Sequence, residues 1–275
     1  MHNVGPQMSR ISQRVRKGIA ATAAALPFLL AGYAGCVETR WLKVTEHTIT
    51  LPGITAPLTI AHVSDLHMRN VGAIEERTLA ALRAAAPDLI VITGDLYDRA
   101  SARETASAFV AQFTAPLGVW FAPGNWEHWV DLPKGTAYVE AANVTSLVNA
   151  SAPVRDDLWI TGFDDVLAGT PKPDEALATV PPGVARLGIF HSPTLFPRIA
   201  DRIDLALAGH THGGQVRLPL IGAVIVPPES RPFADGWYQA GRVQMFVSRG
   251  IGTSILPIRF LCRPELAIIS VRPER

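Results

Sequence analysis

Short apolar runs, each followed by a residue of a metal-ligating type, constrain this chain more than any other feature. The residues at the ends of these runs are Asp65, His67, Asp95, Asn125, His191, His210 and His212. In α/β folds, ligand sites form beyond the carboxyl ends of the strands, so these separate segments are expected to converge in space. The chain must therefore form a sheet structure that gathers its strand ends.

The apolar runs alternate with Ala-rich amphipathic stretches of helical periodicity. Predicted helices cover 72–86, 101–113 and 136–142. Predicted strands cover 58–64, 88–93, 118–122, 158–162, 186–190, 204–208, 215–218, 223–226, 243–248 and 266–271. This order predicts an α/β fold in which two packed mixed β-sheets are flanked by helices.

The N-terminal segment has a different composition. Residues 1–17 are polar and basic, and residues 18–37 carry no charge over 20 positions, which is long enough to cross a bilayer core as a helix. A cleaved signal peptide has the same layout, and Ala34-Gly35-Cys36 leaves a lipoprotein site open. We expect an apolar helical anchor at 18–37, followed by one catalytic domain at 44–275.

The basic residues around this segment predict its orientation. Four of them, Arg10, Arg14, Arg16 and Lys17, precede the apolar run, whereas Arg40 and Lys43 follow it. The excess on the N-terminal side favours a cytoplasmic N-terminus and a catalytic domain outside the inner (cytoplasmic) membrane. A cytoplasmic substrate would require the reverse orientation.

Composition limits the partners of the chain. With 25 Lys and Arg against 24 Asp and Glu, the net charge is +1, so no nucleic-acid partner is expected. The two cysteines, Cys36 and Cys262, lie far apart in the sequence and form neither a disulfide framework nor a zinc site.

The candidate ligands suit two cations. Two carboxylates, four imidazoles and one carboxamide, with no thiolate, favour Mn²⁺, Fe²⁺ or Zn²⁺ over Ca²⁺. Asp65 and His67 are two positions apart, as are His210 and His212, so each pair can project from one side of an extended segment. Each motif alone is a common turn, and only the complete series favours a metal site.

The series Asp65-x-His67, Gly94-Asp95, Gly124-Asn125, His191 and Gly209-His210-x-His212 resembles the signature of the calcineurin-like metallophosphoesterases. Ser64-Asp65-Leu66-His67, the string at 209–215 and the string at 248–252 are similar to one branch of this family. That branch contains bacterial membrane-associated phosphodiesterases related to UDP-2,3-diacylglucosamine hydrolases.

The resemblance implies a phosphodiesterase or pyrophosphatase that uses a hydroxide bridging two divalent cations. It also implies a lipid-linked phosphoester substrate, such as UDP-2,3-diacylglucosamine, and a place in lipid A biosynthesis. Asp65, His67 and His212 would hold one cation, Asn125, His191 and His210 the other, and Asp95 would bridge them. Asp98 and Asp165 are candidates to orient these ligands, or else plain turn and cap carboxylates.

The third motif departs from the family, which has a histidine after Gly-Asn where this chain has Trp126. His128 or Arg249 could take the role of that histidine, and the predicted catalytic residues are Asp95, Asn125, His128 and Arg249. Five aromatic residues are candidates for a substrate groove or for core packing: Trp126, Trp129, Phe233, Trp237 and Tyr238. A broad-specificity enzyme for soluble substrates and a non-catalytic metal-binding protein remain alternatives.

Overall fold

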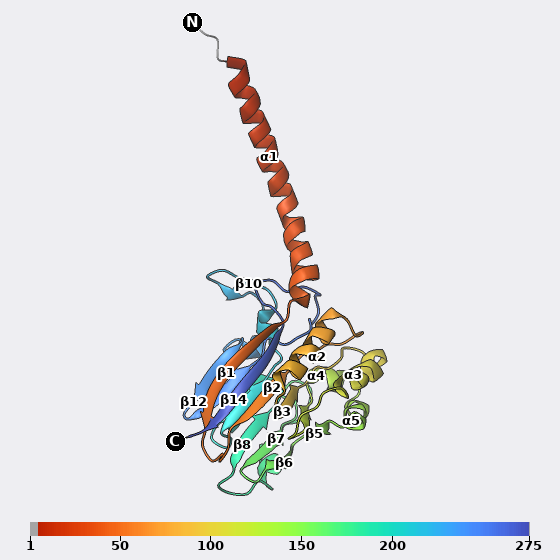
Figure 1. Cartoon of the computed structure of the whole chain (residues 1–275), viewed down its shortest axis with the longest axis vertical. Coiled ribbons are helices and arrows are strands. Elements are labelled where there is room, and N and C mark those ends of the chain that lie inside the picture. The colour runs from red at the N-terminus through yellow and green to blue at the C-terminus, as the bar shows by residue number, and fades with distance from the viewer. Residues whose placement is uncertain (1–4, 275) are drawn as a thin grey trace.

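The computed structural model describes residues 5–274. A long helix, α1 (Gly5–Gly32), projects away from a domain formed by the rest of the chain (Figure 1). It continues into a π-helical turn, Tyr33–Val37, and a 3₁₀ turn, Glu38–Arg40. Residues 1–4 of the predicted basic segment and residue 275 of the predicted domain lie outside the described residues.

The predicted anchor falls within α1 and the turn that follows it. Within residues 5–274, one helical segment, Lys17–Arg40, has the length and composition needed to cross a membrane. The helix passes through Pro27, and nearly all of its described side chains are exposed. This is the pattern of a helix with no protein partner along its length.

Two six-stranded sheets form the centre of the domain. The first sheet has the order β1-β14-β2-β3-β4-β5 and the second has the order β12-β13-β9-β8-β7-β6. The strands of the first sheet are β1 (Lys43–Leu51), β14 (Glu265–Pro273), β2 (Leu58–Val63), β3 (Leu89–Thr93), β4 (Val119–Ala122) and β5 (Thr145–Ser146). Those of the second are β12 (Gly236–Ala240), β13 (Val243–Val247), β9 (Leu205–Ala208), β8 (Ala185–Ile189), β7 (Leu158–Gly162) and β6 (Ala150–Arg155).

Both sheets mix parallel and antiparallel pairs, as the sequence predicts. Strand β14 is parallel to β1 and antiparallel to β2, and β2, β3 and β4 run parallel. In the second sheet β7, β8, β9 and β13 run parallel, with antiparallel β6 and β12 at its edges. A separate short hairpin pairs β10 (Arg217–Leu218) with β11 (Gly222–Ala223).

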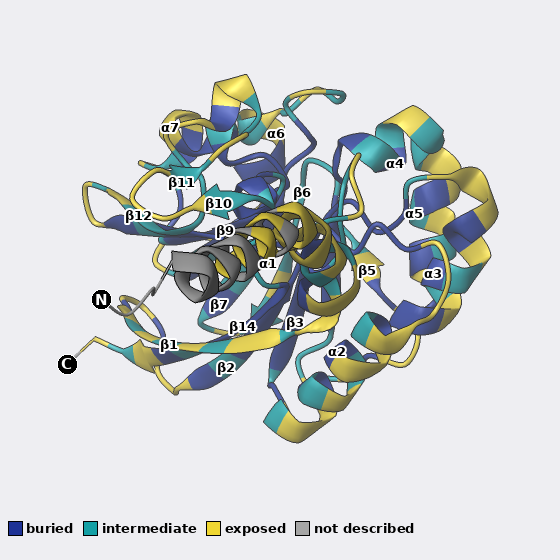
Figure 2. Cartoon of the chain, turned by 90° about the horizontal axis from the view of Figure 1, so that it is seen from above, coloured by how far each residue is buried: buried dark blue, intermediate teal, exposed yellow. Residues whose placement is uncertain are grey.

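Helices cover the outer face of each sheet. Helices α2 (Ala73–Ala85), α3 (Arg103–Val110) and α5 (Leu132–Ala141) pack on the first sheet, and α6 (Pro173–Leu177) and α7 (Phe196–Ile199) on the second. Side chains alternate across β2, so Ala61 faces the helices while Ile60 faces the other sheet, where it joins Leu187 and Leu205. The buried residues follow the sheets through the middle of the domain (Figure 2). The predicted arrangement of helices around two sheets is confirmed.

The carboxyl ends of the central strands lie at the end of the domain that carries α1. Strand β1 starts at Lys43, directly after the turns that follow α1, and runs away from them. Because β14 runs parallel to β1 and β2 runs antiparallel to β14, β2 and its parallel neighbours point back toward α1. The residues that follow β2, β3 and β4 are therefore carried to this end.

Candidate metal centre

The predicted ligands converge as two groups of buried side chains. Each group contains three residues whose candidate ligand atoms lie within 4.8 Å of one another. The first group is Asp65, His67 and His212, and the second is Asp95, His191 and His210. Each group combines the two sheets, because the residues that follow β2 and β3 meet those that follow β8 and β9.

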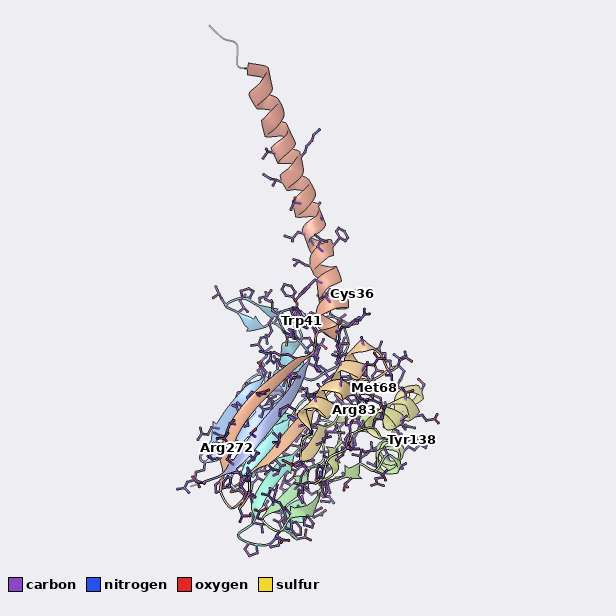
Figure 3. All side chains as sticks on the ribbon, viewed as in Figure 1. Cys36, Trp41, Met68, Arg83, Tyr138 and Arg272 are labelled. Atoms are coloured by element: carbon purple, nitrogen blue, oxygen red, sulfur yellow. The ribbon has the colours of Figure 1, made fainter. Side chains whose placement is uncertain are left out.

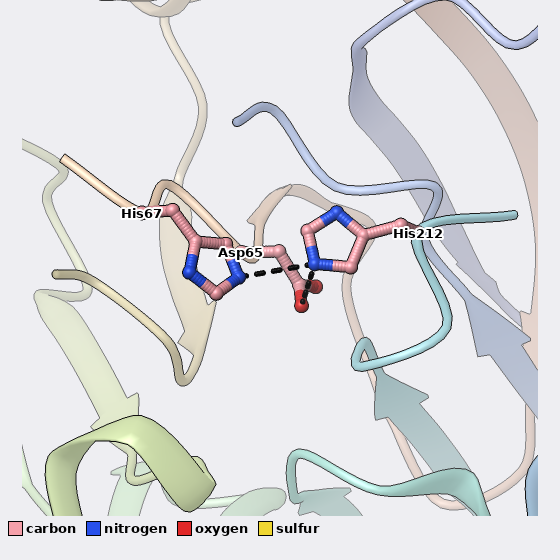
Figure 4. A group of neighbouring side chains, drawn as sticks. All are labelled: Asp65, His67 and His212. Atoms are coloured by element: carbon pink, nitrogen blue, oxygen red, sulfur yellow. Dashed lines mark hydrogen bonds and ion pairs between the residues drawn. The ribbon is translucent and has the colours of Figure 1, made fainter. Parts of the chain in front are cut away.

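In the first group the side chains point toward one another (Figure 4). The Nε2 atoms of His67 and His212 are 3.0 Å apart, and Nε2 of His212 lies 3.2 Å from Oδ1 of Asp65. Burial, together with the positive charge of neighbouring groups, lowers the pKa of His212 well below its ordinary value. A neutral imidazole is the form that binds a metal.

Asp95 belongs to the second group and also faces the first. Its Oδ2 atom is 3.1 Å from Nε2 of His191 and 3.5 Å from Nε2 of His67. The same Nε2 atom of His191 lies 3.1 Å from Nδ1 of His210. A single carboxylate oxygen that faces ligands of both groups is suited to contact two cations.

Asn125 supplies the remaining predicted ligand. It begins the short helix α4 (Asn125–Val130), and its Oδ1 atom is buried without a hydrogen-bond partner among the described residues. A buried oxygen without a donor is costly, and a cation would satisfy it. The donor set and this oxygen therefore fit a pair of divalent cations.

Hydrogen bonds from neighbouring groups orient the ligands. Nδ1 of His191 lies 2.8 Å from the carbonyl oxygen of Thr93, so an N–H at Nδ1 donates to that oxygen and leaves the Nε2 lone pair free for a metal. The backbone N–H of His210 donates to the carboxylate of Asp65, as does the Ser64 hydroxyl. These bonds fix ring and carboxylate orientation independently of a bound ion.

The backbone at the site adopts rare conformations. Five ligands have positive φ angles, which non-glycine residues seldom adopt: Asp65 (53°), His67 (43°), Asp95 (54°), His210 (73°) and His212 (51°). Such conformations cost free energy and persist where the surrounding structure imposes them. At Gly94, which has a φ of 76°, a Cβ atom would lie 2.8 Å from Nδ1 of His191 and would also collide with Gly124.

Sequence reasoning missed Glu127. Its buried carboxylate accepts hydrogen bonds from the backbone N–H groups of Asp95, Leu96 and Gly124, at 2.9, 2.7 and 2.8 Å. It therefore binds the turn that carries Asp95 to the turn that carries Asn125. Burial and the negative charge of Asp95 raise the pKa of Glu127 to about 7. A Glu three residues after Gly124 has the spacing of a capping box, which was the available signal.

The other predicted residues are engaged elsewhere. Nε2 of His128 lies 2.6 Å from Oδ1 of Asp164, and this hydrogen bond raises the pKa of His128. The guanidinium of Arg249 lies 3.0 Å from Glu265 and 3.6 Å from Asp235.

The two carboxylates considered as orienting residues also have local partners. Asp98 pairs with Arg69 and Arg99. Oδ1 of Asp165 accepts hydrogen bonds from the backbone of Leu167 and Ala168, as a turn cap would.

A cavity of about 1120 Å³ opens beside the ligands. Asp95, Asn125, His210 and His212 line it, together with residues 221–228, 254–256 and 258. Of the five aromatic candidates, Trp126 and Trp129 line this cavity. The other three are half-buried and pack against the core: Trp237 lies against Phe246, and Phe233 against Tyr238.

Comparisons with known proteins agree with this geometry. The chain is 29% identical over 260 residues to the uncharacterized metallophosphoesterase YkuE of Bacillus subtilis, covering 88% of this chain and 89% of that protein. It is 28% identical over 270 residues to the phosphodiesterase YaeI of Escherichia coli, covering 93% and 98%. It is 30% identical over 240 residues to a transmembrane protein with metallophosphoesterase domain of Bos taurus, covering 78% of this chain and 53% of that protein.

The family model of the calcineurin-like phosphoesterases matches residues 58–214. This range contains both groups of ligand residues and Asn125. The sequence motif, the fold and this match together show that the chain belongs to the calcineurin-like phosphoesterase family.

Proposed function

We propose that this metal-dependent phosphoesterase hydrolyses phosphodiester or diphosphate bonds with a pair of divalent cations. The position of Asp95 between two ligand groups is the observation that carries the proposal. Asp65, His67 and His212 would hold one cation, and Asn125, His191 and His210 the other, with Asp95 contacting both.

The nitrogen and oxygen donors suit Mn²⁺, Fe²⁺ or Zn²⁺. When bound, such a pair of cations supplies an activated water and stabilises charge that develops on the phosphoryl oxygens. The protein supplies the orientation: Glu127 holds the two turns together, and the backbone N–H of Trp126 donates to Oδ1 of Asp95 at 3.0 Å.

Trp126 favours substrates with good leaving groups. Its ring lies edge-to-face on His67, with ring centroids 5.8 Å apart, and it forms part of the cavity wall. An indole N–H donates a hydrogen bond but does not act as a general acid near neutral pH. A diphosphate or an aryl ester needs less protonation of its leaving group than an alkyl ester does.

We infer further that the substrate is lipid-linked. For a domain that faces the cytoplasm the type compound is UDP-2,3-diacylglucosamine, with lipid A biosynthesis as its setting; a domain outside the membrane would act on another lipid-linked phosphoester. The cavity supports this, because it runs from the ligands to apolar residues such as Ile221, Ile225 and Leu256. The N-terminal segment would anchor the enzyme in the inner membrane as a helix. A cleaved signal would leave no anchor, and a lipoprotein would be held by acyl chains instead of a helix. A relative of this chain is named a transmembrane protein.

Turnover assays separate the alternatives. Purified full-length protein with Mn²⁺ is expected to hydrolyse a chromogenic aryl phosphodiester, and a protein that binds Mn²⁺ without turnover would be non-catalytic. Lipid-linked and soluble diphosphates are then compared in mixed micelles. A higher kcat/KM for the lipid-linked compound is expected, and equal values would favour the broad-specificity alternative.

A further inference from the structure

A group of apolar side chains is exposed around the outer end of the cavity. We call it the apolar rim: Leu220, Ile221 and Ile225 in and beside the β10–β11 hairpin, with Ile255, Leu256 and Leu261 in the loop between β13 and β14. Leu220 is fully exposed, Ile255 is 89% exposed and Ile225 is 74% exposed. The hairpin segment 218–228 carries no charged residue. A contiguous exposed apolar surface of this kind marks an interaction site.

Hydrogen bonds join the loop of the rim to the end of the candidate membrane span. The backbone N–H of Arg259 donates to the carbonyl oxygen of Ala34 at 2.9 Å, and the ring of Phe260 lies edge-to-face on Tyr33. Tyr33 and Ala34 belong to the candidate span Lys17–Arg40. The loop therefore lies at the level at which this span meets the domain. The hairpin lies beside the base of α1 in both overall views (Figures 1 and 2).

An aromatic residue and an arginine mark the same level. Trp41 lies at the base of α1, close to Cys36 (Figure 3). The guanidinium of Arg263 lies 4.1 Å from the centre of the half-exposed Trp41 ring and donates to the carbonyl oxygens of Trp41 and Leu42. Tryptophan is enriched at membrane–water interfaces, and long arginine side chains near the ends of membrane helices reach toward them.

The cavity opens at this level. The strand order carries the ligand residues to the α1 end of the domain, and Ile221, Ile225 and Leu256 line the same cavity as Asp95 and His212. The opening is therefore bordered by side chains suited to lipid.

We propose that the apolar rim inserts into the interfacial layer of the leaflet at which the N-terminal helix ends, so that the cavity opens into the bilayer surface. The bilayer is the chosen partner because the rim lacks charge and is continuous with the candidate span. The substrate would be an amphiphilic phosphoester whose acyl chains stay in the membrane while its phosphate reaches the metal centre. The proposal of a membrane-contacting surface depends on the proposed anchoring by the N-terminal helix. The proposed substrate class depends, in addition, on the proposed hydrolysis.

Fluorescence of the full-length protein tests the surface without relying on turnover. Cys36 is exposed and Cys262 is buried, so a Cys36→Ser parent accepts an environment-sensitive nitrobenzoxadiazole label at one introduced cysteine. The probe variants are Leu220→Cys and Leu261→Cys, which do not line the cavity. The control is Asp156→Cys, an exposed position between β6 and β7 at the opposite end of the domain.

The labelled proteins are reconstituted in nanodiscs of phosphatidylcholine and phosphatidylglycerol, with and without doxyl-labelled phosphatidylcholine. Labels at 220 and 261 are expected to emit at shorter wavelength than the label at 156, and to lose intensity with the doxyl lipid. Emission at both positions that is as insensitive to doxyl lipid as emission at 156 would overturn the proposal.

Hydrolysis of a soluble aryl phosphodiester by the same samples separates the two proposals. Quenching at 220 and 261 without any turnover would support the membrane surface and reject the proposed hydrolysis. Turnover without quenching would support hydrolysis and reject the surface. In Leu220→Ser, soluble turnover is expected to stay unchanged while turnover of a vesicle-embedded phosphoester falls.

Discussion

Asp95 lies within 3.5 Å of histidines from both ligand groups, so its removal affects both cation sites at once. In Asp95→Asn we expect loss of bound metal and of phosphodiester turnover, with a loss of several kcal/mol in transition-state stabilisation. Metal analysis per chain and initial rates measure the two effects.

The matched control is Asp98→Asn, which also removes one carboxylate. Asp98 pairs with Arg69 and Arg99, and its substitution is expected to leave metal content near that of the wild type. Unchanged metal content and rate in Asp95→Asn would contradict the two-cation assignment.

Trp126 allows a second test at the scale of one residue. Trp126→His would introduce a group that can protonate a leaving oxygen, and general acid catalysis contributes about 10²–10⁴ in rate. We expect the variant to accelerate alkyl esters more than aryl esters, with unchanged metal content. Comparing kcat for a series of leaving groups measures this, since the dependence on leaving-group pKa should become shallower. An unchanged dependence would show that the indole serves only as a cavity wall.

The convergence of the candidate ligand residues could be predicted from the sequence, because each follows an apolar strand and parallel strands bring such ends together. Their role as metal ligands stays a prediction. Two features could not be predicted with the same reasoning. The role of Glu127 in joining two turns depends on three backbone N–H groups, of which those of Asp95 and Leu96 belong to a turn far from Glu127 in the sequence. The pairing of His128 with Asp164 joins residues 36 positions apart, and no local pattern specifies such a contact.

At the scale of elements, helix α4 is fixed to the second sheet through the pair of His128 and Asp164. Their hydrogen bond raises the pKa of His128, and it lowers the pKa of Asp164 although burial acts in the opposite direction. Stability from a raised histidine pKa is complete below the unfolded value of about 6.5 and is lost as pH rises through the folded value. Stability from the lowered Asp164 pKa is lost only in acid, as pH falls through its folded value.

We therefore expect His128→Gln to lower the Tm more at about pH 6 than at about pH 9, because charge-assisted hydrogen bonds are stronger than neutral ones. Thermal unfolding of full-length protein in detergent at the two pH values measures this difference. Equal losses of Tm at both values would show that the pair does not depend on the charge of His128. Because the His128 side chain is bound to Asp164, only a small effect on the rate for aryl diesters is expected.

Whether a strand could be predicted from the sequence depends on how much of it is buried. Strands with continuous apolar runs, such as β3 and β9, were predicted because both of their faces are buried. The edge strands β1 and β12 were missed, because their half-exposed residues alternate with polar ones and show no such run. The strand predicted at 223–226 is wrong beyond Ala223. The hairpin pairs only two residues on each side, with one further backbone hydrogen bond from Val224 to Val216.

At the scale of the whole molecule, the charges that flank the apolar segment 18–37 predict that the domain lies outside the cytoplasmic membrane. Protease added to spheroplasts is then expected to degrade the domain without lysis of the cells. A cytoplasmic protein in the same sample serves as the control for intact membranes. Full protection of the domain would reverse the orientation, and it would then favour a cytoplasmic nucleotide-linked lipid.

The junction between α1 and the domain is short and is held by hydrogen bonds. Flexible linkers let a tethered domain sample many heights above a membrane. Here Ala34 and Glu38 accept hydrogen bonds from the backbone N–H groups of Arg259 and Cys262, and β1 starts at Lys43. With the proposed membrane contact, this junction holds the metal centre at a constant height above the lipid. The enzyme would then select substrates by the spacing between the scissile phosphate and the acyl chains, whatever the chemical identity of the headgroup.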